Sequence, residues 1–369
     1  MRARLLIFAT TLLAACQQER GVQAPAAPPP AQSAEAPAPV ITTGLDPALM
    51  AATIAAAEEL PRLRALIVMR DGEQLSANRF NGGPPLDQPV NIKSASKTVI
   101  SALVGIAIER GVLEGPDQPI LTVLADDAPE NPDPQLADIT VDHLLSMRAG
   151  LERTSGGNYG RWVTSPNWVR YALSRPFDDE PGGRMLYSSG STHLLSAMLT
   201  RGSGRSTHDL AEEWLAEPLG VRIPRWQRDP QGVYFGGNNM LMSPKDMARF
   251  GELYRNGGRV GDEQVLPATW IEASWTPRTA SPWSGSGYGY GWFLDEARGY
   301  EIKYARGYGG QMIYLVPALN LTVVATSDPS GDRDNVHQRG LNRLLTEGII
   351  PAAEAGGDAG ASPLMPAAL

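Results

Sequence analysis

Ser94 and Lys97 are the two residues of this 369-residue chain whose types and spacing first suggest chemistry. They stand three residues apart at the start of an apolar run from Thr98 to Ile108, so on a helix their side chains share one face. A hydroxyl at a helix N-terminus with an amine one turn away can act as a nucleophile and its base. The alternative is a serine N-cap beside an ordinary surface lysine, and this spacing alone leaves both interpretations open.

Other familiar catalytic and metal-binding patterns are absent from the sequence. It contains no G-x-S-x-G, no H-E-x-x-H, no paired Cys/His spacing and no glycine-rich phosphate loop with a lysine. An α/β-hydrolase triad and a zinc site are therefore not expected. The net charge of −8 argues against nucleic acid as the main partner. Core or surface roles are expected for the four histidines, which are His143, His193, His208 and His337.

Two further stretches could contribute to a site. Tyr187 stands between the turn at Gly182-Gly183 and an expected helix start at Ser189, where its hydroxyl could point into a cleft. The alternative is a packed tyrosine with Ser189 as an N-cap. Gly309-Gly310 precedes a strand at Met312, and glycines at a strand edge permit close approach of the backbone to a ligand. The alternative there is a β-bulge.

The elements that must position these residues follow a simple order along the chain. Strand patterns lie at both ends, with a hairpin signal at Asp71-Gly72, and helices and long loops lie between them. We therefore predict an α+β fold, in which helices flank an antiparallel β-sheet and a mostly α-helical domain is inserted. The site is expected at the boundary between the two parts. Helices are predicted at 48–60, 94–111, 140–150, 166–173, 189–200, 207–215, from Ser243-Pro244 onward and at 335–349, and later strands at 288–293, 312–316 and 321–326.

The first sixteen residues resemble a bacterial lipoprotein signal. Arg2 and Arg4 precede an apolar stretch that is too short to span a bilayer, and the stretch ends in Leu13-Ala14-Ala15-Cys16. The resemblance implies cleavage before Cys16, lipid attachment there and a membrane partner through that lipid. Gln17 after the cysteine favours the outer membrane, facing the periplasm of the bacterial cell envelope. The alternative is an ordinary secretory signal. Because Cys16 is the only cysteine, no disulfide and no thiol nucleophile are expected.

The remaining boundaries follow from composition. Residues 17–44 are rich in alanine, proline and glutamine, which predicts a disordered tether. The folded domain is placed at 45–350, with an α/β part at 45–111 and 234–350 and a helical part at 112–233. Residues 351–369, which contain Gly356-Gly357 and further prolines, are predicted as a disordered tail.

Taken in order, the three motif stretches resemble the serine β-lactamase and penicillin-binding-protein family. Its S-x-x-K motif corresponds to Ser94-Ala95-Ser96-Lys97, its Y-x-N or Y-x-S element to Tyr187-Ser188-Ser189, and its third motif to Tyr308-Gly309-Gly310. The chain is most similar to the class C-related branch that holds family VIII carboxylesterases and 6-aminohexanoate-dimer hydrolases. The resemblance covers about residues 46 to 350 and implies a β-lactamase/transpeptidase-like fold.

The resemblance also implies roles for individual residues. Ser94 would form an acyl-enzyme, Lys97 or Tyr187 would act as the base, and Tyr187 would protonate the leaving group. The oxyanion would lie between the backbone N–H groups of Ser94 and Gln311, and no metal or cofactor would be needed. Ser189 and the third motif would contribute to substrate binding. Trp162 and Trp168 could line the cleft, with helix packing as the alternative.

Two departures from the family pattern bear on the substrate. Ser189 replaces the usual asparagine, and Tyr308 replaces the lysine or histidine of the third motif, although Arg306 could compensate. We therefore expect hydrolysis of a small-molecule carboxylic ester or linear amide. The alternatives are a D,D-peptidase or β-lactamase and a non-catalytic envelope binding protein. The oligomeric state does not follow from the sequence.

Overall fold

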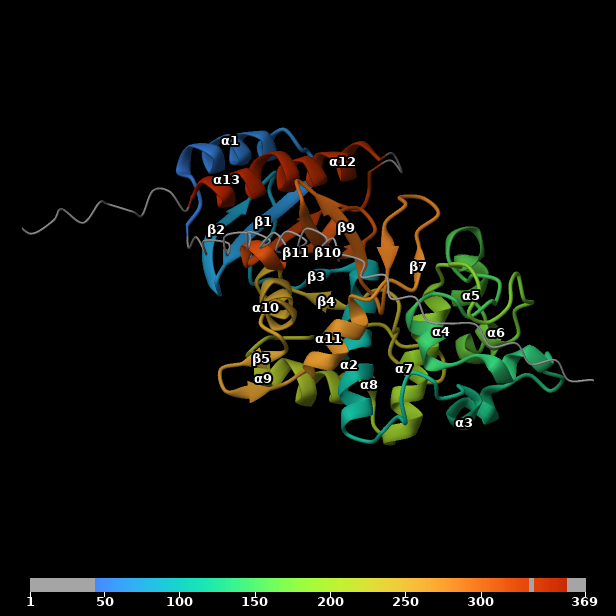
Figure 1. The fold of residues 1–369 in the computed structure, drawn as a ribbon. Coiled ribbons are helices and arrows are strands. Elements are labelled where there is room, and N and C mark those ends of the chain that lie inside the picture. Colours follow the sequence, from blue (N-terminus) through green and yellow to red (C-terminus); the bar gives the residue numbers. More distant parts are fainter. Residues whose placement is uncertain (1–43, 332–334, 357–369) are drawn as a thin grey trace, which may run out of the picture. The chain divides into compact units, whose positions relative to one another are not determined.

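The computed structural model describes residues 44–331 and 335–356. The predicted signal segment, the predicted lipidation site at Cys16, nearly all of the predicted tether and residues 357–369 of the predicted tail lie outside these ranges. All described residues belong to one compact unit. Figure 1 shows its sheet, with helices on both sides and a region dominated by helices and loops next to it.

One antiparallel sheet of eight strands forms the frame, in the order β2-β1-β12-β11-β10-β9-β8-β7. Strands from opposite ends of the domain lie side by side within it, since β1 pairs with β12 from Leu63↔Ser327 to Arg70↔Leu321. The predicted α+β class is confirmed. The strands are β1 (Leu63–Arg70), β2 (Glu73–Arg79), β7 (Thr279–Ala280), β8 (Gly287–Tyr288), β9 (Phe293–Ala297), β10 (Tyr300–Gly307), β11 (Gln311–Val316) and β12 (Leu321–Ser327), with two-residue pairs β3 (Val90–Asn91) with β4 (Leu241–Met242) and β5 (Arg259–Val260) with β6 (Glu263–Gln264).

Strand alternation divides the interior into two hydrophobic cores. On β11, Met312 and Tyr314 belong to one core, and Ile313 and Leu315 belong to the other. This follows from the two-residue period of a strand, which sends successive side chains to opposite faces. Because both faces of β11 are covered, all six of its residues are buried.

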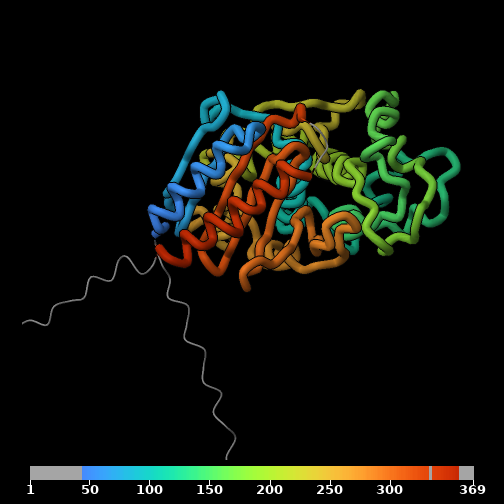
Figure 2. Tube along the Cα trace, turned by 90° about the horizontal axis from the view of Figure 1, so that it is seen from above, coloured from blue at the N-terminus to red at the C-terminus, as the bar shows by residue number. Residues whose placement is uncertain are grey.

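Helices from the two ends of the domain cover one face of the sheet. Figure 2 shows the first helix, α1, beside the last helices of the chain. The predicted tail is wrong at its start, because Ile350–Ala355 forms helix α13 rather than disordered chain. Pro351 stands in the first turn of this helix, where a backbone N–H has no partner within the helix, so the proline costs no hydrogen bond. Ala352 and Ala353 are buried against the rest of the core.

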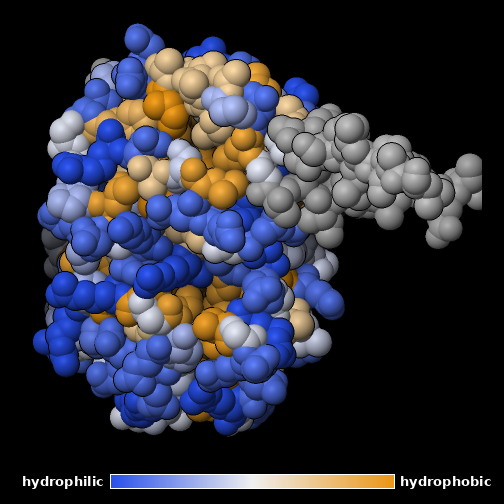
Figure 3. All heavy atoms as spheres, turned by 90° about the vertical axis from the view of Figure 1, so that its left-hand side faces the viewer, coloured by the Kyte–Doolittle hydropathy of each residue, from blue (hydrophilic) through white to orange (hydrophobic). Residues whose placement is uncertain are grey.

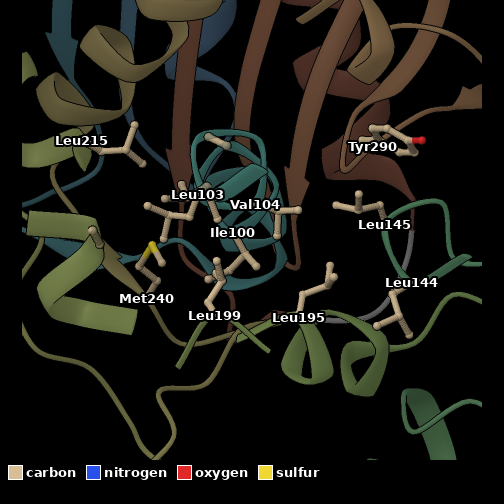
Figure 4. Packing of buried hydrophobic residues seen from close by; sticks show 14 of the residues in the cluster. Ile100, Leu103, Val104, Leu144, Leu145, Leu195, Leu199, Leu215, Met240 and Tyr290 are labelled. Atoms are coloured by element: carbon tan, nitrogen blue, oxygen red, sulfur yellow. The ribbon is translucent and has the colours of Figure 1, made fainter. Parts of the chain in front are cut away.

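The other face is covered by α10 and by α2, the helix behind Ser94. Every residue of α2 from Ser96 to Ala107 is buried. Figure 4 shows Ile100, Leu103 and Val104 of α2 packed among leucines of α7 and α4. The helices are α1 (Pro47–Glu58), α2 (Ser96–Glu109), α3 (Leu121–Leu124), α4 (Val141–Leu145), α5 (Tyr159–Val163), α6 (Trp168–Leu173), α7 (Ser189–Ser203), α8 (Thr207–Ala211), α9 (Glu217–Leu219), α10 (Pro244–Arg255), α11 (Ala268–Ser274), α12 (Val336–Arg343) and α13 (Ile350–Ala355).

Asp142 of α4 connects the helical part to the sheet. Its carboxylate accepts hydrogen bonds from Arg148 at 2.5 Å and from the Tyr290 hydroxyl at 2.6 Å, and it forms an ion pair with Arg278 at 2.8 Å. Tyr290 follows strand β8, and the N–H of Arg278, which precedes β7, donates to the Tyr288 carbonyl of β8, so this cluster holds the β8–β9 connection against α4. The prediction of one strand at 288–293 is wrong: residues 289–292 form the turn between β8 and β9, where Gly291 has a φ of +81°.

Figure 3 shows hydrophilic residues over most of one face, with hydrophobic residues in separate patches. Within residues 44–331 and 335–356, no helix combines the length and apolar character that crossing a membrane requires.

Candidate active site

Ser94 lies in a short 3₁₀ turn, Lys93–Ala95 (η1), that leads directly into α2. Lys93 has a φ of +53°, a left-handed conformation that is costly for a residue with a side chain. Two contacts hold it there: its N–H donates to Asn91 Oδ1 at 2.9 Å, and Gly307 of β10 packs against it so closely that an added Cβ would lie 3.1 Å from the Lys93 Cβ. The serine is therefore presented at a fixed position beside the end of β10.

Lys97 is buried beside Ser94, with 2% of its surface exposed. Its Nζ lies 3.1 Å from Ser94 Oγ and 3.2 Å from Ser189 Oγ, and it also donates to the carbonyl of Gly237. All three partners are neutral, and no carboxylate forms an ion pair with Lys97 among the described residues. Burial lowers the pKa of Lys97 from 10.5 to about 7, so the amine can be neutral near neutral pH and can accept a proton.

Tyr187 approaches Ser94 from the loop before α7. Its ring stacks on Phe293 with centroids 6.2 Å apart, and Lys97 Nζ lies 5.1 Å from its centroid. Burial raises the pKa of Tyr187 to about 12, although a hydrogen bond with Ser94 and the charge of Arg306 both act in the opposite direction. The hydroxyl therefore stays protonated where Lys97 loses its proton. The structure brings Ser94, Lys97 and Tyr187 together, as their predicted roles require.

Ser189 is fixed at the first turn of α7 by a second set of hydroxyl groups. Its N–H donates to Ser155 Oγ at 2.9 Å, and Ser155 Oγ lies 3.2 Å from Ser189 Oγ. Thr154 and Ser188 form the next contact, because the Thr154 N–H donates to Ser188 Oγ at 3.1 Å. These bonds tie the tyrosine loop to residues 154–155 and hold Ser189 against Lys97.

The carbonyl of Gly237 and the loop that presents it were not predicted from the sequence. Asp229 starts this loop and accepts from the N–H groups of Gln231 and Val233 at 2.9 Å and 2.8 Å. His193 of α7 lies between the loop's two ends: its Nε2 is 3.0 Å from Asp229 Oδ2, and its Nδ1 accepts from the Gly236 N–H at 3.5 Å. The glycine pair at 236–237 was the available signal, since an added Cβ at either position would clash with the backbone of α7.

Trp162 and Trp168 do not line a cleft. They are 0% and 2% exposed, and their rings pack around His193 with centroid distances of 5.7 Å and 5.5 Å. Their indole N–H groups donate to the carbonyls of Trp168 and Val163. Helix packing, the alternative interpretation, describes both residues because their polar and apolar groups are all satisfied inside the protein.

The third motif lies in the turn between β10 and β11. Tyr308 is 47% exposed, and added Cβ atoms at Gly309 and Gly310 would meet Pro329 and His337 rather than the serine turn. The Gln311 side chain binds β12 through Ser327, to which it donates at 2.6 Å and from which it accepts at 3.2 Å. Its backbone pairs with Gly307, the residue that contacts Lys93. The proposed oxyanion role of Gln311 and the substrate role of this turn remain predictions.

The site as a whole supplies a hydroxyl, an amine that can be neutral and a phenol. That set can transfer a proton from a nucleophile to a leaving group without any other ionisable side chain. Within the described residues no group of three or more His, Cys, Asp or Glu side chains could hold a metal ion.

Comparison with known proteins gives the class. The Beta-lactamase family model matches residues 61–347, most of the chain, and the chain therefore belongs to the Beta-lactamase family. The resemblance predicted from the three motifs is confirmed. With the site described above, the protein is a serine hydrolase of the β-lactamase and penicillin-binding-protein superfamily.

Individual relatives are distant. The D-alanyl-D-alanine-carboxypeptidase/endopeptidase AmpH of Escherichia coli K12 is 23% identical over 303 residues, which are 72% of this chain and 78% of the relative. A putative 6-aminohexanoate-dimer hydrolase from Bacillus anthracis superposes with a TM-score of 0.67 at 19% identity, covering 78% of this chain and 79% of the other. EstCE1, a hydrolase with promiscuous acyltransferase activity, gives 0.66 at 18% identity, covering 81% and 97%. At these identities the structural matches show the shared fold alone.

Proposed function

We propose that the protein hydrolyses carboxylic esters or linear amides through an acyl-enzyme on Ser94. The observation that carries this proposal is the position of Lys97, which is buried, pairs with no carboxylate of the described residues and lies 3.1 Å from Ser94 Oγ. A neutral amine at hydrogen-bonding distance is what a serine needs to become a nucleophile near neutral pH.

Each proton has a donor and an acceptor in this mechanism. Lys97 accepts the proton of Ser94 as the serine oxygen attacks the carbonyl carbon, and Tyr187 gives its proton to the leaving oxygen or nitrogen. Tyr187 then regains a proton from the Lys97 ammonium through a water molecule. The opposite pKa shifts of the two groups favour Lys97 as the base and Tyr187 as the acid. Water completes the cycle by attacking the acyl-enzyme carbonyl: neutral Lys97 accepts a proton from the water, and its ammonium returns the proton to the Ser94 oxygen as the ester bond breaks.

The negative charge that develops on the carbonyl oxygen needs backbone donors. We place it between the N–H groups of Ser94 and Gln311, at the positive end of α2. Gly307 supports this placement, because it pairs with Gln311 and packs against Lys93, the neighbour of Ser94.

The substrate class rests on the third motif. A lysine or histidine there would bind the carboxylate of a β-lactam or peptide, and this chain has Tyr308 instead. An alternative is a D,D-peptidase or β-lactamase activity, which the similarity to AmpH favours. Arg306, whose charge lowers the pKa of Tyr187, would supply the cation that this alternative requires.

Two measurements test the proposal. A fluorophosphonate probe should label the wild-type protein and not Ser94→Ala, and absence of labelling on the wild type would indicate a non-catalytic binding protein. Hydrolysis of p-nitrophenyl acetate without hydrolysis of a chromogenic cephalosporin or release of D-alanine from a pentapeptide supports the ester or amide assignment. The reverse pattern supports the alternative.

We also propose, from the sequence of the first sixteen residues, that the chain is lipidated at Cys16 and anchored in the outer membrane facing the periplasm. Metabolic labelling with a fatty-acid analogue in a bacterial host should mark the wild type and not Cys16→Ala. Equal labelling of the two would contradict it.

A further inference from the structure

Two half-buried asparagines, Asn91 and Asn239, lie between the two loops that hold the reactive pair, and neither takes part in the proton transfers described above. One loop follows β3 and presents Ser94, and the other precedes β4 and presents the Gly237 carbonyl to Lys97. β3 and β4 pair over two residues each, so the backbone pairing between the loops is short.

The side-chain amides of Asn91 and Asn239 continue this pairing where the strands end. Asn91 Nδ2 donates to Asn239 Oδ1 at 2.9 Å, and Asn91 Oδ1 accepts from the Lys93 N–H at 2.9 Å. Asn239 Nδ2 in turn donates to Gln227 Oε1 at 2.6 Å. Asn91 is thus bonded on one side to the residue before the nucleophile and on the other side to the loop that carries Gly237.

Both loops turn through a left-handed residue beside this contact. Lys93 has a φ of +53°, and Asn239 has a φ of +60°. Lysine is costly in this conformation, whereas asparagine adopts it more readily. The Asn91 amide bonds to the backbone of Lys93 and to the side chain of Asn239, so a single side chain connects the two turns. The position of the nucleophile turn is therefore coupled to the position of the loop that contacts the base.

We propose that Asn91 and Asn239 form an amide clamp, and that they are positioning residues that keep Ser94 Oγ at hydrogen-bonding distance from Lys97 Nζ. The inference rests on the proposed function, in which Lys97 accepts the proton of Ser94. One side of the amide clamp fixes the turn that carries the nucleophile, and the other side fixes the loop whose Gly237 carbonyl holds the amine. A displacement of about 1 Å between reacting groups can lower a rate by about a hundredfold. Loosening the amide clamp should therefore lower kcat with little effect on substrate binding.

The first test uses single substitutions in the full chain, with p-nitrophenyl acetate as the substrate. Asn239→Gly removes the amide and keeps the left-handed backbone, which glycine adopts without strain. It should lower kcat by about tenfold and change KM by less than about threefold. Asn91→Ala should lower kcat by about thirtyfold, because it also removes the acceptor of the Lys93 N–H. A wild-type kcat in Asn239→Gly would overturn the proposal, even if Asn91→Ala does not fold.

The double variant Asn91→Ala/Asn239→Gly distinguishes a shared clamp from two independent losses. Residues that act through one bond have non-additive effects, so the double variant should have about the same kcat as Asn91→Ala. Effects that multiply in the double variant would contradict the amide clamp. Asn78→Ala is the matched control, because Asn78 is a half-buried asparagine of β2 whose Nδ2 donates to Ser76 Oγ at 2.7 Å. It should keep the wild-type kcat.

A measurement on Lys97 itself separates failure of this inference from failure of the proposed function. The chain has four lysines, so protein labelled with carbon-13 in lysine gives few side-chain NMR signals, and Lys97→Met assigns the signal of Lys97. Because the amide clamp holds the Gly237 carbonyl against the amine, the midpoint of the Lys97 titration should move in Asn91→Ala and Asn239→Gly and stay in Asn78→Ala. That result supports the amide clamp even if no ester is hydrolysed. A wild-type midpoint in both clamp variants overturns it even if the ester is hydrolysed as proposed.

Discussion

Helix α7 carries two buried polar clusters, one at Ser189 in its first turn and one at His193 a turn later. In the first cluster, the Lys97 amine is surrounded by two hydroxyls and a carbonyl. In the second, the His193 ring is fully buried between Asp229 and the Gly236 N–H, within a cage of aromatic rings. Both clusters contain an ionisable nitrogen. Among the described residues, the nitrogen of the second is paired with a carboxylate and that of the first is not.

The difference explains which cluster can react. A histidine beside an aspartate suggests catalysis, but here both nitrogens of the ring have partners and neither residue is exposed. Its effect is to fix the loop from Asp229 to Gly237, whose last carbonyl then contacts Lys97. The His193 cluster thus positions the Gly237 carbonyl, which belongs to the Lys97 cluster. An amine without a counter-charge is unfavourable for stability and useful for proton transfer.

The largest effect is expected for Lys97→Met. Removing the proposed base should lower kcat/KM for an ester by about a thousandfold, within the range for general base catalysis. Lys303→Met is the matched control, since Lys303 is also a buried lysine but pairs with Glu301 at 3.1 Å. Activity within tenfold of the wild type in Lys97→Met would contradict the assignment of Lys97.

The same variant should gain stability at low pH. The pKa of Lys97 lies near 10.5 in the unfolded chain and near 7 in the fold, so burial of the charged form becomes more costly as pH falls between these values. At pH 6 the methionine variant should be more stable by about 5 kcal/mol, since each unit of the pKa difference corresponds to about 1.4 kcal/mol, and this advantage should shrink to about 1 kcal/mol at pH 10. Urea unfolding of both proteins at the two pH values measures it. A variant that is less stable than the wild type at pH 6 would contradict it.

Asp229→Ala should mainly reduce stability, whereas Lys97→Met should mainly reduce activity. The substitution leaves the buried His193 ring and the buried N–H of Val233 without their acceptor, and it also removes the acceptor of the Gln231 N–H. We expect the free energy of unfolding to fall by about 3 kcal/mol. Asp262→Ala, on an exposed turn, should change it by less than about 0.5 kcal/mol. An Asp229→Ala protein as stable as the wild type would remove the proposed role of this pair.

The comparison also shows what the sequence could and could not predict. Ser94, Lys97 and Tyr187 belong to local motifs, and the strand patterns near Leu63 and Val324 imply that the two ends of the domain share a sheet. The contact of Gly237 with Lys97 joins residues 140 positions apart, and no local pattern predicts it. Trp162 and Trp168 were ambiguous for the same reason, because an aromatic residue packs equally well in a core or along a cleft until its neighbours are known.

The predicted end of the folded domain at residue 350 was wrong, because the local sequence there says little about structure. Pro351 and the following alanines were predicted as part of a disordered tail, but their helix is stabilised by α1 and by a hydrogen bond from the Asp46 N–H to the Ala352 carbonyl. That partner lies some 300 residues earlier in the chain. Tertiary contacts of this kind override the composition of a short segment.

The pH dependence of catalysis should report the protonation of Lys97 directly. Because only neutral Lys97 can accept the serine proton, kcat/KM should rise with pH with a midpoint near 7 and be about tenfold below its plateau at pH 6. Tyr187, with a pKa near 12, should cause no decline below pH 10. A midpoint near 10 would mean that Lys97 is charged in the resting enzyme, and the assigned roles would then be wrong.

The smallest effect is expected for Ser189→Ala. It tests whether one hydroxyl of the Lys97 cluster changes the midpoint of the pH profile. Ser189 Oγ accepts from Lys97 Nζ at 3.2 Å, a bond that favours the charged amine. Its loss should lower the pKa of Lys97 further, so the midpoint of the pH profile should move to lower pH while the plateau of kcat/KM falls about threefold. Ser196→Ala is the control on the same helix, because Ser196 bonds the Tyr234 carbonyl and Thr207 in the sealed region. That variant should lose stability and keep the wild-type midpoint. A midpoint that moves to higher pH in Ser189→Ala would show that the hydroxyl stabilises the neutral amine instead, and that Ser189 donates to Lys97 rather than accepts from it.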